Sequence, residues 1–252
     1  MIKMMAAICR KPGMTHAEYL AYIQHVHGAI ATQNPVTLRR YVQNHVFDSA
    51  FGTAAEASHS MVVSRDSVTE LYWDSPQDMQ TTNQHEHVRT KAGPDGANFS
   101  DRPVALSLIA TEVEQSVAQP GNGRGAKTLH FVRAAEGLAL PEFFERWAKA
   151  HALALERAPE AAAAVRRCVH SRLLPDFNPV LKYFGGLDVV YEGVASLWFD
   201  NVATVGAFRA YERVLLEINA NPKTAFYRPA QSFFLYATEA LIYERGSSGR
   251  PT

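Results

Sequence analysis

Histidines stand at two equivalent places in the sequence, and their ring nitrogens are suited to acid–base chemistry. The stretch EYLAYIQHVH, residues 18–27, ends at His27, and EFFERWAKAH, residues 142–151, ends at His151. A partly buried imidazole stays neutral at pH 7 and can take a proton from a phenol or from a carbon next to a carbonyl group. The pair therefore predicts proton transfer. A core histidine satisfied by a carbonyl oxygen is the alternative for each.

The two histidines belong to an internal repeat with an offset of 124 residues. Tyr19 falls on Phe143 and Ile23 falls on Trp147 at this offset. Three further pairs of segments follow in the same order: RYVQN (40–44) with RCVHS (167–171), ELYWD (70–74) with SLWFD (196–200), and ATE (110–112) with ATE (237–239). A repeat of this length indicates a domain duplication, because solenoid repeats are only about 20 to 50 residues long.

A segment rich in glycine and proline, QSVAQPGNGRGA at 115–126, separates the two copies. We expect a first repeat at 1–116, a linker at 117–126, a second and divergent repeat at 127–245, and a flexible tail at 246–252.

The elements that position the histidines recur in each copy. Strands are expected at 2–10, 39–47, 67–74 and 103–112 in the first repeat, and at 128–134, 165–173, 193–199 and 231–242 in the second. Thr15 and Glu18 form a capping box for the first long helix, and Pro141 suits the first turn of its counterpart.

The element order predicts an α+β fold. Two ferredoxin-like β-α-β-β-α-β repeats would pack sheet to sheet as an intrachain pseudo-dimeric α+β barrel. Such a chain can be a monomer or a homodimer, and the third and fourth strands would leave edges that invite dimerisation.

Side-chain alternation divides each second strand into two faces. Val42, Asn44 and Val46 share one face, which we expect to form a dry seam between the sheets. The other face carries Tyr41, Gln43 and His45 and is expected to look toward the helix that ends at His27. The same alternation places Cys168, His170 and Arg172 toward the second helix, so each repeat is predicted to hold a cavity between helix and sheet.

Aromatic residues on the third strands suit either a substrate or the core. Tyr72, Trp73, Trp198 and Phe199 would give flat walls for an aromatic compound, with plain core packing as the alternative.

The segment at 83–101 has the composition of a loop, with Gly93, Pro94 and Gly96. His85 or His87 could lie on a lid that closes the pocket. The His-Glu-His sequence at 85–87 is a weak metal signal, and the Arg-Pro pairs at 102–103 and 228–229 are predicted to begin strands.

Composition narrows the classes of partner. Charged residues cancel to a formal net charge of zero, and the pI is near 7.2, so nucleic acid and membrane are not expected partners. No long apolar run or leader-like segment occurs, which predicts a cytoplasmic protein. Cys9 and Cys168 fit reduced, buried thiols better than a disulfide, and nucleotide-binding and serine-hydrolase motifs are missing from the sequence.

RKPGMTHAEYLAYIQHVHGAI (10–30), followed by RRYVQNHV (39–46), resembles the EthD family of dimeric α+β barrel proteins. The family pattern is Arg-Lys-Pro-Gly, Thr, an acidic–aromatic pair, a His near the end of the first helix, and later Arg-Tyr-x-Gln-Asn-His. The second repeat keeps the helix and His151, but it lacks the Lys-Pro-Gly turn and the Gln-Asn-His. The resemblance implies the barrel fold; relatives include cofactor-free monooxygenases, dehydratases, cyclases, isomerases and haem proteins.

The positions that match the EthD pattern and the predicted cavities between helix and sheet together indicate which residues form the site. We expect His27, His45 and Asn44 to be catalytic. Substrate-binding residues are expected to be Tyr22, Tyr41, Tyr72, Trp73 and His87, and a second pocket is expected at His151, His170 and Arg172. We expect no metal ion and no cofactor.

Three functions remain open. The leading prediction is a cofactor-independent lyase, dehydratase or isomerase that acts on a small hydrophobic aromatic or carbonyl compound by histidine acid–base chemistry, since no redox motif occurs. Its alternative within catalysis is a cofactor-free monooxygenase of an aromatic or polyketide-like substrate. The others are a haem protein with His27 or His151 as axial ligand, and a non-catalytic binding protein with filled pockets.

Overall fold

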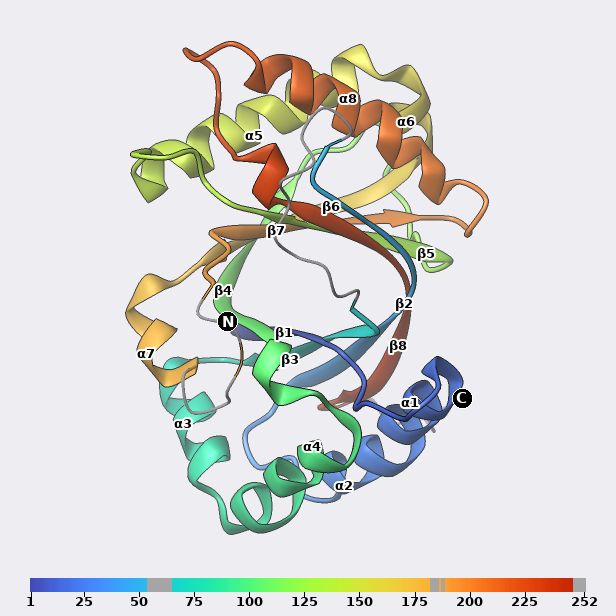
Figure 1. Cartoon of the computed structure of the whole chain (residues 1–252), viewed down its shortest axis with the longest axis vertical. Coiled ribbons are helices and arrows are strands. Elements are labelled where there is room, and N and C mark those ends of the chain that lie inside the picture. The colour runs from blue at the N-terminus through green and yellow to red at the C-terminus, as the bar shows by residue number, and fades with distance from the viewer. Residues whose placement is uncertain (54–64, 182–185, 187–188, 247–252) are drawn as a thin grey trace.

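Eight antiparallel strands close into one barrel between two layers of helices (Figure 1). The structure is a computed structural model of the whole chain, and it describes residues 1–53, 65–181, 186 and 189–246. The strands follow the order β1-β3-β2-β8-β5-β7-β6-β4 around the barrel. Because the barrel is closed, β4 is next to β1, so the first repeat contributes the sheet β4-β1-β3-β2 and the second contributes β8-β5-β7-β6. Each is a ferredoxin-like sheet, and the predicted pseudo-dimeric α+β barrel is confirmed.

The elements of the first repeat alternate as the sequence predicts. They are β1 (Ile2–Ile8), α1 (His16–Ala21), η1 (Tyr22–His27), α2 (Gly28–Gln33), β2 (Arg40–Phe51), β3 (Ser67–Trp73), α3 (Pro76–Gln84), η2 (Val88–Ala92), α4 (Gly93–Phe99), η3 (Arg102–Val104) and β4 (Leu106–Gln115). The predicted capping box is present, because the Thr15 hydroxyl accepts from the Glu18 amide and the Glu18 carboxylate accepts from the Thr15 amide.

The second repeat has the same plan with a longer first helix. Its elements are β5 (Ala126–Val132), α5 (Leu140–Arg157), α6 (Pro159–Ala164), β6 (Val165–Leu173), η4 (Pro175–Phe177), α7 (Asn178–Leu181), β7 (Gly193–Phe199), η6 (Val205–Ala207), α8 (Phe208–Asn219), η7 (Pro229–Gln231) and β8 (Phe233–Glu244). Pro141 occupies the first turn of α5, as expected.

Pairing between the repeats closes the barrel at two seams. β2 pairs with β8 from Arg40 opposite Glu244 to Phe51 opposite Phe233, and β4 pairs with β6. β3 and β4 each have a neighbour on both sides. The expectation that the third and fourth strands leave free edges is therefore wrong, because the two sheets join edge to edge into one cylinder.

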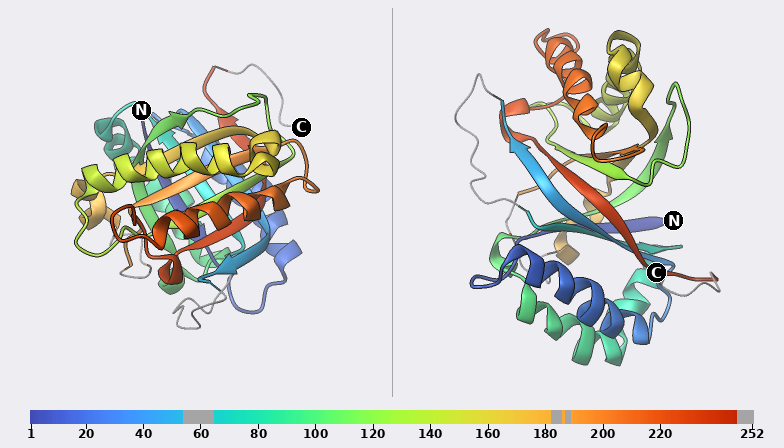
Figure 2. Two further views of the ribbon diagram at one scale, coloured as in Figure 1. Left: turned by 90° about the horizontal axis from the view of Figure 1, so that it is seen from above. Right: turned by 90° about the vertical axis from the view of Figure 1, so that its right-hand side faces the viewer.

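The helices of each repeat cover one side of the barrel (Figure 2). α1, η1, α2, α3 and α4 form the layer of the first repeat, and α5, α6 and α8 form the opposite layer. Outward-facing side chains of the strands therefore meet helices, whereas inward-facing ones meet the other repeat.

One part of the barrel interior is apolar. Its buried side chains include Met5, Val46, Leu108 and Leu235, and the rings of Phe131 and Phe233 stack at 4.6 Å between centroids. Val42 and Val46 point inward as predicted, because both are buried on the face of β2 opposite Gln43.

The rest of the interior is charged, so the prediction of a uniformly dry seam is wrong. Glu70 is fully buried, and its carboxylate accepts from Lys3 Nζ at 2.8 Å and from Lys127 Nζ at 2.5 Å. Lys3 also binds Glu112, and Lys127 also binds Glu239. Two lysines therefore share three carboxylates in the middle of the barrel, where each charge has a partner.

Most of the segment 83–101 is helical and does not form the expected loop. α3 continues to Gln84, and η2 and α4 follow from Val88 to Phe99. Pro94 lies in the first turn of α4, where proline does not interrupt a helix. The glycine and proline signals thus mark the start of a helix that packs against η1.

The two Arg-Pro pairs precede strands, but each lies at a short 3₁₀ turn. Arg102 donates to the carbonyl oxygen of Gly93, and Arg228 donates to that of Ala134. Both guanidinium groups therefore form hydrogen bonds that stabilise the fold.

Three other features of the chain bear on earlier expectations. Cys9 and Cys168 are buried, and neither forms a disulfide bond within the described residues. None of the helices in the described part of the chain has the length and apolar character needed to cross a membrane. The predicted tail at 246–252 lies outside the described residues except for Gly246.

Removal of the Glu70 charge should destabilise the fold. In Glu70→Gln, Lys3 and Lys127 stay buried with fewer carboxylates, so the free energy of unfolding should fall by about 3 kcal/mol in urea titration. The control is Glu114→Gln, because the ion pair of Glu114 with Arg167 is exposed and contributes little. Equal losses in the two variants would contradict a central role for Glu70.

The same variant has a predictable pH dependence. Burial opposes ionisation of Glu70, but Lys127 and Lys3 outweigh it and hold the pKa of Glu70 well below its usual value. A carboxyl group with a lowered folded-state pKa stabilises the fold above its unfolded-state pKa, and the stabilisation is lost as pH falls through the folded-state pKa. The stability difference between wild type and Glu70→Gln should therefore shrink on acidification in unfolding curves recorded at several pH values.

Candidate active site

His27 and Asp95 form a hydrogen-bonded pair between two helical segments of the first repeat. His27 is the last residue of η1, and Asp95 lies in the first turn of α4. Nδ1 of His27 is 2.8 Å from Oδ2 of Asp95. The side chains are 18% and 8% exposed, so the pair is mostly withdrawn from water.

Asp95 is held by two further donors. Its Oδ1 accepts from the Tyr22 hydroxyl at 2.7 Å and from Asn98 Nδ2 at 2.9 Å. Burial opposes ionisation of Asp95, but the hydrogen bonds from Asn98, Tyr22 and His27 outweigh it and lower the pKa of Asp95. Asp95 is therefore a fixed anion at neutral pH.

This anion sets the tautomer of His27. Burial lowers the pKa of His27 below its usual value, and Asp95 opposes that shift only in part. The ring is therefore neutral at pH 7, and its Nδ1–H donates to Asp95. Nε2 has no hydrogen-bond partner among the described residues, and the side chain is 18% exposed, so the lone pair of Nε2 is free to accept a proton.

A π-helical turn explains where His27 points. In η1 the amide of Gly28 donates to the carbonyl of Ile23, five residues earlier, so the turn is wider than in an α-helix. At about 100° per residue, an α-helix would place Tyr19, Ile23, Val26, His27 and Ile30 on one face, and the sequence predicts that this face points inward. Tyr19 and Ile23 are buried, but Val26 is 43% exposed and His27 turns toward α4. The prediction that His27 points into the sheet is thus corrected.

His45 belongs to a different group from His27. It lies on the helix-facing side of β2, and its Nε2 is 3.1 Å from Oε1 of Gln43. Gln43 donates in turn to the Ile23 carbonyl at 2.7 Å, and so ties β2 to the π-helical turn. Burial, together with the charges of His16 and His25, lowers the pKa of His45. The predicted face of β2 is confirmed, whereas a catalytic pairing of His45 with His27 stays a prediction.

Asn44 points away from this layer. Its side chain lies inside the barrel and donates to the Val68 carbonyl and to Glu70, both at 2.8 Å. Alternation along β2 puts Asn44 on the face opposite His45, so it cannot act with His27.

The predicted substrate-binding residues are dispersed by the same alternation. Tyr72 lies inside the barrel with its hydroxyl 2.6 Å from Glu70, whereas Trp73 lies under α3 and donates to Thr82. Tyr41 is buried and accepts from Gln43. Only Tyr22 lies beside His27, through Asp95.

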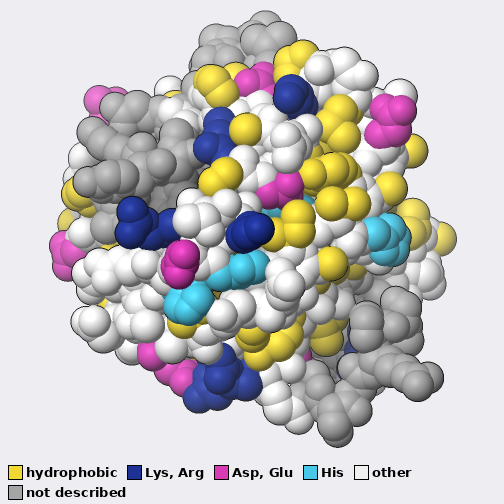
Figure 3. Space-filling model, turned by 90° about the horizontal axis from the view of Figure 1, so that it is seen from below, with side chains coloured by type: hydrophobic (Ala, Val, Ile, Leu, Met, Phe, Trp, Pro, Cys, Tyr) yellow, Lys and Arg dark blue, Asp and Glu magenta, His cyan; other side chains and the backbone are white. Residues whose placement is uncertain are grey.

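His87 is part of the helical packing and does not lie on a lid. Its Nε2 is 2.7 Å from the Ile30 carbonyl, which joins the start of η2 to α2. Histidine side chains do reach the surface of the first repeat's helical layer, beside basic side chains (Figure 3).

The second repeat brings His151 and His170 together, but Arg172 lies apart from them. His151 and His170 have ring centroids 5.5 Å apart under α5. Arg172 lies over the Phe144 ring and borders a groove of about 650 Å³. This groove is lined by Pro141, Phe144, Glu145, Ala148, Lys149 and Arg172, and no histidine faces it.

Side chains occupy the expected hollows between helices and sheet. Tyr19, Ile23 and Gln43 are 0 to 2% exposed in the first repeat, and the Trp147 ring stacks on His170 at 3.7 Å in the second. What is available for chemistry is His27, whose side chain is 18% exposed and whose Nε2 has no hydrogen-bond partner among the described residues.

Haem does not fit either histidine. Both ring nitrogens of His151 have partners, the Tyr211 hydroxyl at 3.0 Å and the Ser116 carbonyl at 2.9 Å, and the residue is 2% exposed. The Phe99 ring lies 4.6 Å from the ring of His27 and leaves little of it exposed. A haem macrocycle needs far more open space beside its ligand nitrogen than this partly covered ring leaves.

Asp95 and Asn98 were missed by the sequence analysis. They lie in GPDGANF, residues 93–99, whose composition predicts a loop. The spacing of three residues between them suits a pair on one helical face, but that signal has meaning only once the segment is known to be a helix.

Replacement of Asp95 should lower the pKa of His27. In Asp95→Asn the neutral amide no longer stabilises the imidazolium, so burial acts with less opposition. The pKa can be read from the His27 ring signals in an NMR pH titration. Asp200→Asn is the control, because Asp200 pairs with Arg166 in the other repeat. An unchanged or raised pKa in Asp95→Asn would contradict the proposed pairing in solution.

Solved structures share this fold at low sequence identity. An anthrone oxidase-like protein is 10% identical with a TM-score of 0.51, covering 99% of this chain and 96% of that chain. A proposed monooxygenase from Fusobacterium nucleatum subsp. nucleatum is 5% identical with a TM-score of 0.50, covering 100% and 96%. A chlorite dismutase variant from Candidatus Nitrospira defluvii is 7% identical with a TM-score of 0.50, covering 96% and 92%. These similarities concern the fold alone.

Sequence comparison identifies the family. No curated protein sequence matches the chain. The EthD domain profile matches residues 11–103 and 135–221, one segment in each repeat and more than half of the chain. The chain therefore belongs to the EthD family, with two EthD domains in tandem.

Proposed function

We propose that the chain is an enzyme that removes a proton from a small phenolic or carbonyl compound and then lets the deprotonated compound react with dioxygen. The observation that carries the proposal is the His27–Asp95 pair, joined at 2.8 Å, with Nε2 of His27 left without a hydrogen-bond partner among the described residues. His27 is the general base and Asp95 is the positioning residue.

The geometry supports each step of the proton transfer. Asp95 holds Nδ1–H, so the lone pair of Nε2 faces the incoming O–H or C–H bond. As the proton arrives, the imidazolium that forms is stabilised by the adjacent carboxylate, without proton transfer to it. Tyr22 and Asn98 keep the carboxylate in place, so little reorganisation accompanies the reaction.

Dioxygen is the proposed second reactant. A carbanion next to a carbonyl group can give electrons to dioxygen, and a CH₂ group then becomes C=O while the second oxygen atom leaves as water. The anthrone oxidase-like protein and the proposed monooxygenase among the structural neighbours favour this outcome over a lyase, dehydratase or isomerase reaction. The same proton abstraction would begin either course, so an oxygen measurement separates them.

A second candidate is a non-catalytic binding protein. It is favoured by the filled helix–sheet interfaces, where Tyr19, Gln43 and His170 are fully buried. Such a protein would be stabilised by aromatic acids, ketones or aldehydes in thermal unfolding without converting any of them.

Replacement of His27 should abolish most turnover. We expect kcat of His27→Gln to fall by about 10² to 10⁴, the usual contribution of a general base, on hydroxylated aromatic ketones that the wild type converts. His25→Gln is the matched control, because His25 is an exposed neighbour on the same turn. Wild-type activity in His27→Gln would rule out the proposed role.

The rate should also follow the ionisation of His27. Only the neutral ring accepts a proton, so kcat/KM should rise as pH increases through the lowered pKa of His27 and be level at neutral pH. An oxygen electrode, with parallel anaerobic reactions, tests the second reactant. Full conversion without oxygen would replace the oxygenase proposal by the lyase or isomerase one.

A further inference from the structure

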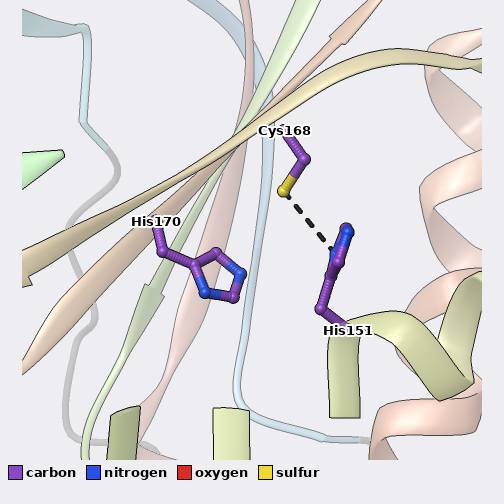
Figure 4. Close-up of side chains that lie close together, drawn as sticks. All are labelled: His151, Cys168 and His170. Carbon is purple, nitrogen blue, oxygen red and sulfur yellow. Dashed lines mark hydrogen bonds between the residues drawn. The ribbon is translucent and has the colours of Figure 1, made fainter. Parts of the chain in front are cut away.

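Three side chains that the proton-transfer site does not use meet beneath α5. His151 comes from α5, and Cys168 and His170 come from the helix-facing side of β6 (Figure 4). Their ligand-type atoms all lie within 4.8 Å of one another, and Sγ of Cys168 is 3.6 Å from Nδ1 of His151. The three residues are at most 2% exposed.

His170 is the member without a partner. Neither of its ring nitrogens has a hydrogen-bond partner among the described residues, although both are buried. Its ring lies flat on Trp147, with centroids 3.7 Å apart and planes at 6°, and Figure 4 shows it turned toward His151 and Cys168. A buried, unpaired imidazole is rare in folded proteins because it loses its bonds to water without replacement.

His151 is prepared as an electron-pair donor. Its Nε2 faces the Ser116 carbonyl at 2.9 Å, and a carbonyl oxygen can only accept, so the proton is on Nε2. The lone pair is then on Nδ1, where it accepts a hydrogen bond from the Tyr211 hydroxyl at 3.0 Å beside Cys168, and a metal ion would take the place of that hydrogen bond. A second ring nitrogen bound to a backbone carbonyl is the usual support of a histidine that binds a metal.

We propose that His151, Cys168 and His170 bind one thiophilic transition-metal ion, copper(I) or zinc, at a site separate from His27. Two imidazoles and a thiolate form a ligand set that suits both ions. The proposal does not depend on the proposed oxygenase activity.

The distances suit a shared ion. With bonds of about 2.3 Å to sulfur and about 2.0 Å to nitrogen, sulfur and nitrogen on one tetrahedral ion lie about 3.5 Å apart. The Cys168–His151 separation of 3.6 Å is close to that value. His170 would close from within 4.8 Å by about 1 Å, which its ring can do by sliding along the face of Trp147.

Charge balance favours copper(I) of the two. Binding replaces the S–H bond of Cys168 by a metal–sulfur bond and releases the proton to solvent. One thiolate and two neutral imidazoles cancel the charge of copper(I), whereas zinc would leave a net positive charge. The site is buried and holds no carboxylate, so that residual charge would be unfavourable.

The test measures metal retention by the whole chain. Purified protein, stripped by a chelator, is loaded with one equivalent of copper(I) under anaerobic reducing conditions or with zinc, desalted, and analysed for metal per chain. We expect one ion per chain, a thiolate-to-copper charge-transfer band, and tighter retention of copper(I) than of zinc against competing chelators. Tighter retention of zinc would overturn the charge argument, and retention of neither ion would overturn the site.

Matched variants locate the ion. Cys168→Ser removes the thiolate, and His170→Phe removes both ring nitrogens while keeping a ring against Trp147. Each should weaken binding by at least about 100-fold, since loss of even a supporting group weakens metal affinity by about 10- to 100-fold. Cys9→Ser, at the other buried cysteine, should bind like wild type. Equal binding by Cys168→Ser and wild type would overturn the assignment.

Thermal unfolding of the wild-type protein tests the proposal even if the variants fail to fold. An ion that binds only the folded chain raises the midpoint of thermal unfolding, and a chelator reverses the rise. An unchanged midpoint at saturating copper(I) and at saturating zinc would overturn the proposal without any substitution.

Discussion

The ionic contact of Glu70 with Lys3 and Lys127 in the barrel interior constrains the rest of the structure. Lys3 comes from β1 of the first repeat and Lys127 from β5 of the second, so one carboxylate joins the two halves. The lysines are equivalent in the repeat, as are Glu112 and Glu239, but Glu70 corresponds to Ser196, whose buried hydroxyl has no partner among the described residues. A single asymmetric anion therefore bridges a symmetric pair of cations, each of which also pairs with the equivalent glutamate of one repeat, Glu112 or Glu239. Since a buried charge is tolerated only beside its partner, the contact fixes which side chains of β1, β3 and β5 point inward.

The side chains that point into the barrel determine which ones point outward, because successive side chains along a strand alternate between its two faces. With Asn44 held by Glu70 inside the barrel, Gln43 and His45 must face the helices of the first repeat. In the second repeat Val169 is inside, so Cys168 and His170 face α5. Both proposed sites are thus on the outer side of a barrel whose interior is occupied by packed and paired side chains.

The features that depend on the internal repeat and on side-chain alternation could be predicted from the sequence. Features whose local backbone geometry is set by tertiary contacts could not. The duplication, the order of strands and helices along the chain, the capping box at Thr15 and the two faces of β2 all follow from residue spacing and are present. The π-helical turn has no such signal: the Ile23 carbonyl accepts from both Gly28 and Gln43, and Gln43 is on a strand. Asp95 was missed because glycine and proline at 93 and 94 resemble a loop, although they begin a helix. Asn44 was grouped with His27 through the family resemblance against the parity of its own strand.

The two equivalent histidines show how a small change of helical geometry separates two chemistries. α5 is a regular α-helix, and the spacing from Phe143 through Trp147 to His151 keeps all three against the sheet, where His151 meets a thiol and a second imidazole. In η1 the wider turn rotates His27 away from the sheet and toward Asp95. An imidazole at the dry interface has lone-pair donors as neighbours and suits a metal ion, whereas a partly exposed one beside an ionised carboxylate suits proton transfer. The duplicated position therefore need not have a duplicated role: the local path of the backbone decides what each ring can bind.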